Sequence, residues 1–170
     1  MWRIDPVHSE ITFRIRHFIT PVRGAFVKWE GVIAADPKNL SKGSVKVAVE
    51  TTSVDTNDER RDTHLTSNDF FATDSFPSLT FASTKVELTG TKVTLWGDRT
   101  IRGTTKPVVL AGEFLGRTKG MDGKERIGFD VSRKVNRLDY GVRWNRAVEG
   151  GGAVLSDDVT ITISVETIKQ

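Results

Sequence analysis

The chain contains no cysteine among its 170 residues. This absence excludes disulfide bonds, zinc sites built from thiolates and cysteine nucleophiles. No run of apolar residues approaches the roughly 20 that a membrane-spanning helix requires, and we find no internal repeat, linker or low-complexity tract. Hydrophobic residues make up 37% and charged residues 28%, which is typical of a globular protein. A single domain over residues 1–170 is therefore predicted.

Catalytic and metal-binding motifs are also missing. Asp5, His8 and Ser9 have the residue types of a hydrolytic triad, but His8 and Ser9 would point to opposite faces of a strand. The chain has no G-x-S-x-G, H-E-x-x-H or D-D-x-x-D sequence. We therefore expect no enzyme activity, no catalytic residue, no cofactor and no metal. Asp5 and Ser9 are expected to hold the entry of the first strand through side-chain hydrogen bonds to the backbone.

What the chain does have is alternation. The odd positions Ile11, Phe13, Ile15, His17 and Ile19 form a nearly apolar face, while the even positions Glu10, Thr12, Arg14 and Arg16 form a charged one. This period of two predicts a strand with one buried face. Similar segments recur, most clearly over 159–166, and turn residues separate them at 36–39, 88–90, 120–123 and 150–152. About eight strands at hairpin spacing predict an antiparallel sandwich or barrel.

One segment departs from this alternation. The sequence Thr56-Asn57-Asp58-Glu59 fits a capping box with Thr56 as the N-cap, which predicts a short helix running towards Leu65. Ser67 is expected to cap a further turn through Phe71.

Two polar residues fall on apolar faces. His17 has the parity of Phe13, so it is either a hydrogen-bonded core residue or a polar anchor inside a ligand cavity. Arg99 has the parity of Leu95, and an unpaired buried guanidinium is too costly to be tolerated. Either a bulge at Gly97 turns Arg99 outward, which we favour, or it meets an acidic partner or an anionic ligand group.

Seven segments, taken together and in order, resemble the YceI-like family. They are Ile4-Asp5-Pro6-x-His8-Ser9, Val22-Arg23-Gly24-x-Phe26, Ser53-Val54-Asp55-Thr56, Arg61-Asp62-x-His64-Leu65-x-Ser67-x-Asp69-Phe70-Phe71, Phe76-Pro77-x-Leu79-x-Phe81-x-Ser83, Thr100-Ile101-Arg102-Gly103-Thr104-Thr105-Lys106-Pro107-Val108 and Asn136-Arg137-x-Asp139-Tyr140-Gly141. The resemblance implies an all-β, eight-stranded antiparallel lipocalin-like β-barrel with one short helix packed against it. It also implies an elongated internal pocket for a polyisoprenoid chain or a related amphiphile, often in a bacterial dimer. Arg99 departs from the family pattern, which usually has an apolar residue at that place.

The preferred functional hypothesis is non-catalytic binding and transport of an isoprenoid lipid, with a polyprenyl or quinone-type chain, in an apolar barrel lumen. The predicted ligand-binding residues are Phe13, Ile15, His17, Phe26, Val47, Phe81, Leu95, Arg99, Leu110, Phe129, Ile161 and Ile163. Such a ligand must be collected from a bilayer, so transient membrane contact is expected. We also expect a homodimer and no nucleic-acid partner.

An alternative hypothesis uses the outside of the barrel. Its basic residues Arg14, Arg16, Arg102, Lys106 and Arg143 would hold nucleic acid or an acidic protein, with an affinity that falls steeply with salt. The lack of aromatic residues interleaved with these basic residues argues against binding of single-stranded nucleic acid.

No signal peptide precedes Trp2, so the sequence as written is expected in the cytoplasm, and a trimmed form in the periplasm or outside the cell.

Overall fold

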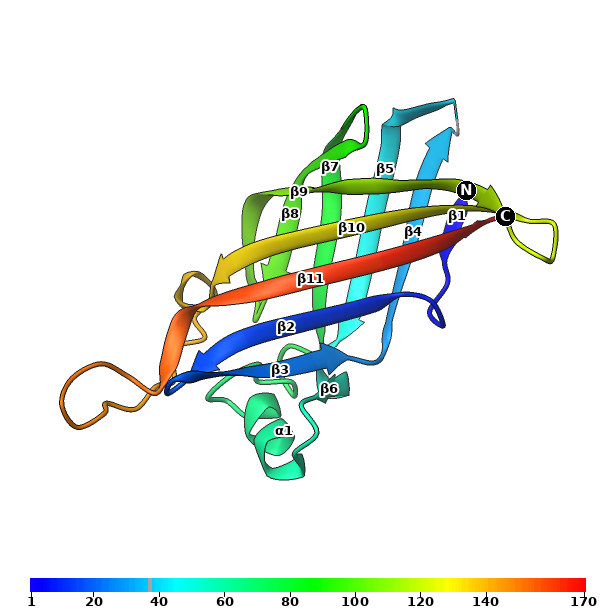
Figure 1. Cartoon of the computed structure of the whole chain (residues 1–170). Coiled ribbons are helices and arrows are strands. Elements are labelled where there is room, and N and C mark those ends of the chain that lie inside the picture. The colour runs from blue at the N-terminus through cyan, green and yellow to red at the C-terminus, as the bar shows by residue number, and fades with distance from the viewer. Residues whose placement is uncertain (37) are drawn as a thin grey trace.

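A strongly curved antiparallel sheet dominates the computed structural model, which describes residues 1–36 and 38–170 (Figure 1). Pro37, in the turn predicted over 36–39, lies outside the described residues. The strands are β1 (Trp2–Ile4), β2 (Glu10–His17), β3 (Thr20–Phe26), β4 (Trp29–Asp36), β5 (Asn39–Glu50), β6 (Val54–Asp55), β7 (Ser78–Thr89), β8 (Lys92–Ile101), β9 (Thr104–Lys119), β10 (Glu125–Asn136) and β11 (Leu155–Lys169). The helices are α1 (Glu59–Thr66) and two short 3-10 helices, η1 (Thr51–Ser53) and η2 (Arg137–Tyr140).

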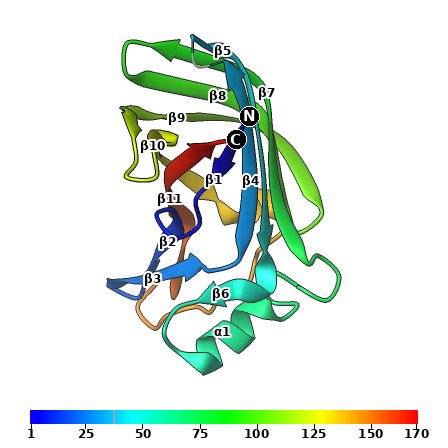
Figure 2. The same cartoon turned by 90° about the vertical axis from the view of Figure 1, so that its right-hand side faces the viewer.

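The sheet closes on itself. Its strands follow the order β1-β4-β5-β7-β8-β9-β10-β11, and β11 pairs back onto β1, so the described residues form a ring of eight antiparallel strands. β2 pairs with β11 next to β1, and β3 pairs with β2, so β1 and β2 together run along one side of β11. Figure 2 shows the two chain ends side by side where the ring closes. The predicted eight-stranded barrel is confirmed.

Large apolar side chains fill the end of the barrel near the chain termini. Trp2 is 0% exposed and packs with Ile33 and Ile127. Its indole Nε1 donates a hydrogen bond of 3.3 Å to the carbonyl oxygen of Ala35, which satisfies the buried N–H group. This end of the barrel is therefore closed by side chains.

The break between β1 and β2 is held as the sequence predicts. The backbone N–H of Val7 donates to Asp5 Oδ1 at 3.0 Å, and Ser9 Oγ donates to the carbonyl oxygen of Glu166 at 3.1 Å. The far end of β2 differs from the prediction. β2 ends at His17, which pairs with Thr20, so the next two residues form the hairpin turn and Ile19 is 94% exposed. The prediction that Ile19 faces inward was wrong, because the alternation stops where the strand stops.

Helix α1 forms, but its cap is not the predicted one. Asp58 is the N-cap, and its carboxylate accepts a hydrogen bond of 2.9 Å from the backbone N–H of Arg61. Thr56 was the expected cap, but its hydroxyl donates to Asp62 Oδ1 at 2.6 Å and accepts from Arg61 Nε at 2.7 Å. Ser67 accepts a hydrogen bond from the backbone N–H of Asp69, and the residues after it form turns.

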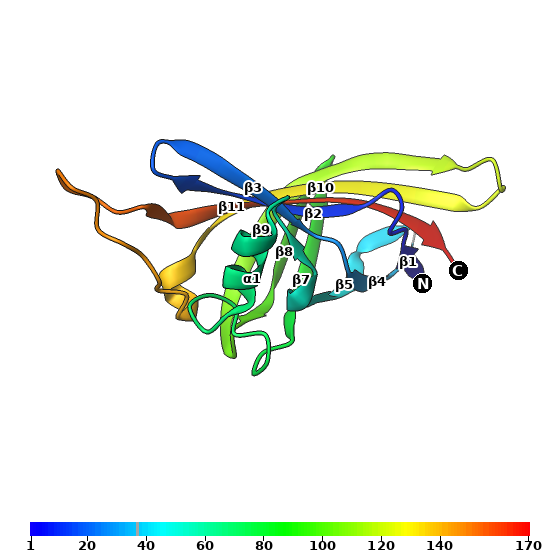
Figure 3. The same ribbon diagram turned by 90° about the horizontal axis from the view of Figure 1, so that it is seen from below.

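The predicted packing of a short helix against the barrel is confirmed. α1 lies at one end of the barrel, next to β6 and below β3 in Figures 1 and 2, and the view from below shows it in front of the strands (Figure 3). Leu65 packs against Phe26 and Phe70 in two clusters of the core. None of the helices in the described part of the chain is long and apolar enough to cross a membrane.

Candidate functional site

The barrel encloses an elongated cavity of about 380 Å³, a volume within the range of small-molecule sites. Every residue predicted to bind ligand lines it: Phe13, Ile15, His17, Phe26, Val47, Phe81, Leu95, Arg99, Leu110, Phe129, Ile161 and Ile163. We call this space the lumen cavity. The contact of these residues with a ligand stays a prediction, while their shared position around one space is a property of the structure.

The lumen cavity is hollow because its inward-facing side chains leave space between them. Phe81, Ile161 and Ile163 point inward on their strands but remain half-buried, whereas side chains in a filled barrel would be buried completely. The sequence could not distinguish a filled barrel from a hollow one, since both have the same alternation.

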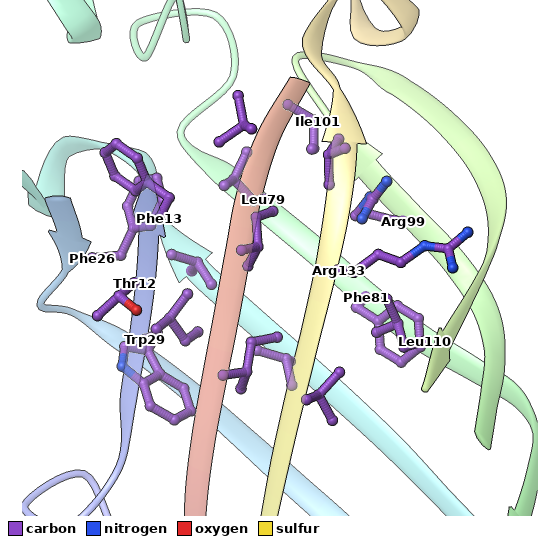
Figure 4. A pocket seen from close by; sticks show the side chains of 18 of the residues that line it. Thr12, Phe13, Phe26, Trp29, Leu79, Phe81, Arg99, Ile101, Leu110 and Arg133 are labelled. Atoms are coloured by element: carbon purple, nitrogen blue, oxygen red, sulfur yellow. The ribbon is translucent and has the colours of Figure 1, made fainter. Parts of the chain in front are cut away.

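Aromatic rings line the part of the cavity beside β2 and β3 (Figure 4). The ring centroids of Phe13 and Phe26 are 5.7 Å apart, and those of Phe26 and Phe71 are 5.6 Å apart in an edge-on arrangement. These contacts fix the rings in place without polar groups. The wall here offers a ligand mainly apolar contact, with the hydroxyl group of Thr12 beside the rings.

His17 lies in the lining at the end of β2. Its side chain has no hydrogen-bond partner in the described part of the chain and packs edge-on against Phe18, with centroids 4.9 Å apart. The expectation of a hydrogen-bonded core histidine was therefore wrong. A polar anchor for a ligand is the interpretation that stays open as a prediction.

Arg99 faces the lumen cavity, so the favoured prediction that a bulge at Gly97 turns it outward was wrong. The pairing of β8 with β9 runs through this region without a shift, and the irregularity lies on β7, between Ser83 and Lys85. Arg99 Nε donates a hydrogen bond of 3.0 Å to the Tyr140 hydroxyl, and its guanidinium lies 5.1 Å from the centre of that ring. The partner of the Arg99 side chain is therefore an aromatic residue, Tyr140, and not an acidic one.

Three further arginines line the lumen cavity that the sequence analysis did not select: Arg61, Arg133 and Arg137. Arg133 could have been found, since it has the inward parity of Val131 and Val135 on β10. Arg61 was not predictable in this way, because helix α1 brings it to the barrel end and Thr56 holds it there.

Arg137 is the most deeply buried of these arginines, at 5% exposed. Its Nη1 donates to the carbonyl oxygens of Val142 at 2.9 Å and Trp144 at 2.8 Å, and its Nε donates to Ser156. Its Nη2 is buried with no hydrogen-bond partner among the described residues. Burial lowers the pKa of this guanidinium, and the nearby charge of Asp157 opposes that shift.

Helix α1 brings His64 to the same end of the cavity. Its ring lies edge-on to Phe70 and Trp144, with centroids 5.0 Å and 4.9 Å away, and its Nε2 is 2.7 Å from Asp69 Oδ2. His64, Phe70 and Trp144 all belong to the lining. The rings narrow the cavity where α1 covers the barrel.

A cluster outside the cavity combines Asp5, His8 and Glu166, whose ligand atoms lie within 4.8 Å of one another. A metal ion could use such atoms, but Arg126 Nη1 already lies 3.5 Å from Asp5 Oδ2 and 3.2 Å from Glu166 Oε1. The hydrogen bond to His8 lowers the pKa of Asp5, and the same bond raises the pKa of His8. We interpret the cluster as an ion-pair network that ties the β1–β2 break to β10 and β11.

The basic residues of the alternative hypothesis lie on several elements. Arg14 and Arg16 are on β2, Arg102 is in the β8–β9 turn, Lys106 is on β9 and Arg143 follows η2. Arg102 donates hydrogen bonds to the carbonyl oxygens of Gly141 and Asn68, and Arg16 donates to that of Ala153. Two of the five therefore hold loops in place, and no observation favours a nucleic-acid surface.

Comparison with known proteins gives a family match over almost the whole chain. Residues 2–167 match the family described as YceI-like domain. The protein YceI of Shigella flexneri is 37% identical over 164 residues, which cover 96% of this chain and 83% of that protein.

Two solved structures share the fold at low sequence identity. BcnA of Burkholderia cenocepacia superposes with a TM-score of 0.83 at 20% identity, over 96% of this chain and 98% of that one. A polyisoprenoid-binding domain from Saccharophagus degradans superposes with a TM-score of 0.72 at 14% identity, over 99% and 98% of the two chains.

Proposed function

This chain belongs to the YceI-like domain family, and on that basis we propose that it binds and transports an isoprenoid lipid, with a polyprenyl or quinone-type chain, without changing it chemically. The main observation in support of the proposal is the hollow and mostly apolar lumen cavity, since the side chains of an eight-stranded barrel can also fill its interior. The polyisoprenoid-binding domain of Saccharophagus degradans, which has the same fold, supports this class of ligand.

Burial of the lipid chain would supply the binding energy. One five-carbon isoprene unit loses on the order of 100 Å² of surface to water on entering an apolar channel, worth roughly 2.5 kcal/mol at about 25 cal/mol per Å². A few units therefore suffice for tight binding without any polar contact. The walls would then select a ligand by the width and length of its chain.

Transport requires exchange with a bilayer, and we place the membrane contact at the β2–β3 turn. Phe18 and Ile19 form its tip and are 49% and 94% exposed. They directly follow His17, which lines the lumen cavity, and Arg14 and Arg16 on β2 are exposed beside them. Apolar side chains inserted into the interface and basic side chains near anionic headgroups both favour attachment to a membrane.

The first test is to identify what the purified protein carries. Solvent extraction of unheated protein, followed by mass spectrometry, should release a stoichiometric lipid whose homologues differ by isoprene units. Native mass spectrometry should show the same mass bound to the intact chain. A clean apoprotein that also fails to bind added quinones and polyprenols would contradict the proposal.

A matched pair of variants tests where the lipid lies. Val47→Phe narrows the lumen cavity, whereas Val32→Phe makes the same change on the exposed face of β4. We expect the first to lower the lipid content of the purified protein and the second to leave it unchanged. Phe13→Arg should remain soluble and empty, and equal lipid content in all variants would place the lipid elsewhere.

The homodimer stays a prediction that light scattering after size exclusion can test.

A further inference from the structure

The lumen cavity has charge of one sign only. Four arginines line it, namely Arg61, Arg99, Arg133 and Arg137, and no aspartate or glutamate does so among the described residues. Cations that face an apolar space are costly, since such a space solvates them poorly. Arg61, Arg99 and Arg137 are at least partly buried, whereas Arg133 is exposed. A neutral isoprenoid chain would leave these charges as they are, whereas an anion would compensate them.

Two of these arginines also line an opening in the wall. β9 and β10 pair only up to Gly112 and Val131. Beyond that point, residues 104–111 of β9 pair only with β8, and residues 132–136 of β10 pair only with β11. We call the hollow between these two edges the β9–β10 gap. Its volume is about 480 Å³.

The β9–β10 gap and the lumen cavity share four lining residues: Arg99, Arg133, Val135 and Tyr140. In Figure 4, Arg133 extends from β10 towards the side on which Arg99 lies. Lys106 and Lys134 line the gap as well. Four cations therefore line the gap on the outside of the barrel, and two of them, Arg99 and Arg133, also line the lumen cavity.

The acidic residues of the β9–β10 gap do not neutralise these cations. Asp98 and Asp139 line it, but neither forms an ion pair with Arg99, Arg133, Lys106 or Lys134 within the described part of the chain. Arg99 uses only its Nε, for Tyr140, so that its two terminal nitrogens have no partner in the same part of the chain. Paired terminal nitrogens of arginine match the two oxygens of a phosphate or carboxylate.

We propose that the β9–β10 gap is an anion site in which Arg99 and Arg133 hold the charged headgroup of an amphiphile, a phosphate or a carboxylate, while its apolar chain lies in the lumen cavity. The proposal rests on the proposed function, because it needs the chain in the lumen. Arg137 adds to it a buried positive charge whose Nη2 has no hydrogen-bond partner among the described residues. Tyr140 fixes Arg99 at the boundary between cavity and gap.

Protection of open strand edges explains only part of this charge. Lys106, Pro107 and Lys134 stand on the two unpaired edges, and such residues prevent edges from pairing with other chains. Arg99 and Arg133 have the inward parity of their strands and line the cavity itself. Arg133 is exposed on the unpaired stretch of β10 and can protect that edge as well. Arg99 stands on β8, where it pairs with Phe81 and with Lys106, so edge protection gives no reason for an arginine there.

Isothermal titration calorimetry with three ligands tests the proposal. Farnesyl phosphate carries a phosphate, palmitate a carboxylate, and farnesol the same chain as the first without a charge. We expect Arg99→Leu to weaken the binding of at least one anionic ligand by about tenfold or more, the effect of losing hydrogen bonds to a charged group. Farnesol affinity should stay the same or rise. Which anion responds identifies the headgroup.

Three further variants make the result specific. Arg133→Leu should weaken the same anion, and Arg99→Lys should restore part of the affinity, because it keeps the charge and loses the paired geometry. Arg23→Leu removes an exposed arginine of β3, outside both the cavity and the gap, and should change nothing. Thermal unfolding checks that each variant is folded.

The outcomes separate the two proposals. Wild-type protein that binds none of the three ligands overturns the proposed function. Wild-type protein that binds farnesol and both anions, with Arg99→Leu binding all of them unchanged, overturns the anion site alone. An equal loss of farnesol and anion affinity in a folded Arg99→Leu would also overturn it, since the arginine would then only shape the cavity.

Discussion

The ring of Phe13 on β2 lies against the α-carbon of Gly24, which is its direct partner on β3. A Cβ atom at Gly24 would come within 2.9 Å of Phe13 Cε1 and 2.8 Å of Thr56 Cγ2, closer than such atoms approach in proteins. The absence of a side chain at Gly24 therefore leaves room for the Phe13 ring, which lines the lumen cavity.

Gly24→Ala should consequently destabilise the barrel and move the Phe13 ring. We expect a loss of about 1–3 kcal/mol in the free energy of unfolding, the usual cost of overpacking, measured by denaturant titration. Gly128→Ala is the matched control, because its Cβ would meet Leu115 at an ordinary 3.5 Å. That control should be neutral or slightly stabilising. Equal effects of the two substitutions would contradict the role given to Gly24.

The Asp5–His8 pair should make stability depend on pH. His8 has its pKa raised above 6.5, so its contribution is complete below pH 6.5 and is lost as the pH rises through the raised value. Asp5 has its pKa lowered below 3.8, so its contribution is complete above pH 3.8 and is lost as the pH falls through the lowered value. Both contributions are therefore complete between pH 3.8 and 6.5.

The melting temperatures of wild type and His8→Gln, measured from pH 4 to pH 9, test this window. The wild type should have its largest advantage between pH 4 and 6.5 and lose it in the alkaline range. Because Arg126 also faces Asp5, some of the Asp5 contribution should survive in the variant. A difference between the two proteins that is constant over the whole range would show that the ion pair is not responsible.

The β2–β3 turn should attach the protein to anionic membranes. Ile19→Asp exchanges its most exposed apolar side chain for a charge, and we expect binding to vesicles containing phosphatidylglycerol to fall by about tenfold or more. Met121→Asp is the matched control, since it lies in the β9–β10 turn at the opposite end of the molecule (Figure 1). Vesicle flotation measures both. A loss in Met121→Asp alone would reverse the proposed orientation on the membrane.

The barrel was predictable because alternation is a local property of each strand. Ile11, Phe13 and Ile15 indicate their common face without knowledge of any partner strand, and the same holds for Ile161 and Ile163. The family resemblance then supplied the closure of the sheet. Parity alone was thus enough to predict that these residues line the cavity.

The wrong predictions concern residues whose position depends on a second part of the structure. Ile19 continues the alternation, but pairing of His17 with Thr20 ends the strand before it. Thr56 fits a capping box, but Arg61 and Asp62 engage its hydroxyl. Such contacts depend on the fold and leave no trace in a single sequence.

Arg99 was misplaced for the same physical reason. Its cost of burial argued for a bulge, because the neighbouring acid, Asp98, has the opposite parity on the strand. The compensation comes from Tyr140, 41 residues further along the chain, which combines a hydrogen bond with an aromatic face. Arg61 reaches the cavity through α1, which no strand parity could reveal.

The pairing of β1 with β11 has a consequence for how the cavity arises. In β1, Trp2 pairs with Ile33 of β4 on one side and with Lys169 of β11 on the other, so β1 joins the two edges of the wall. Of these three strands β1 is synthesised first and β11 last. Contacts between such distant residues are expected to make folding slow, because a long loop must be closed before they form. The wall can thus be sealed only when β11 has been synthesised. A ligand of the lumen cavity would therefore meet a finished barrel or one that is closing around it, because a partly synthesised chain cannot yet enclose the cavity.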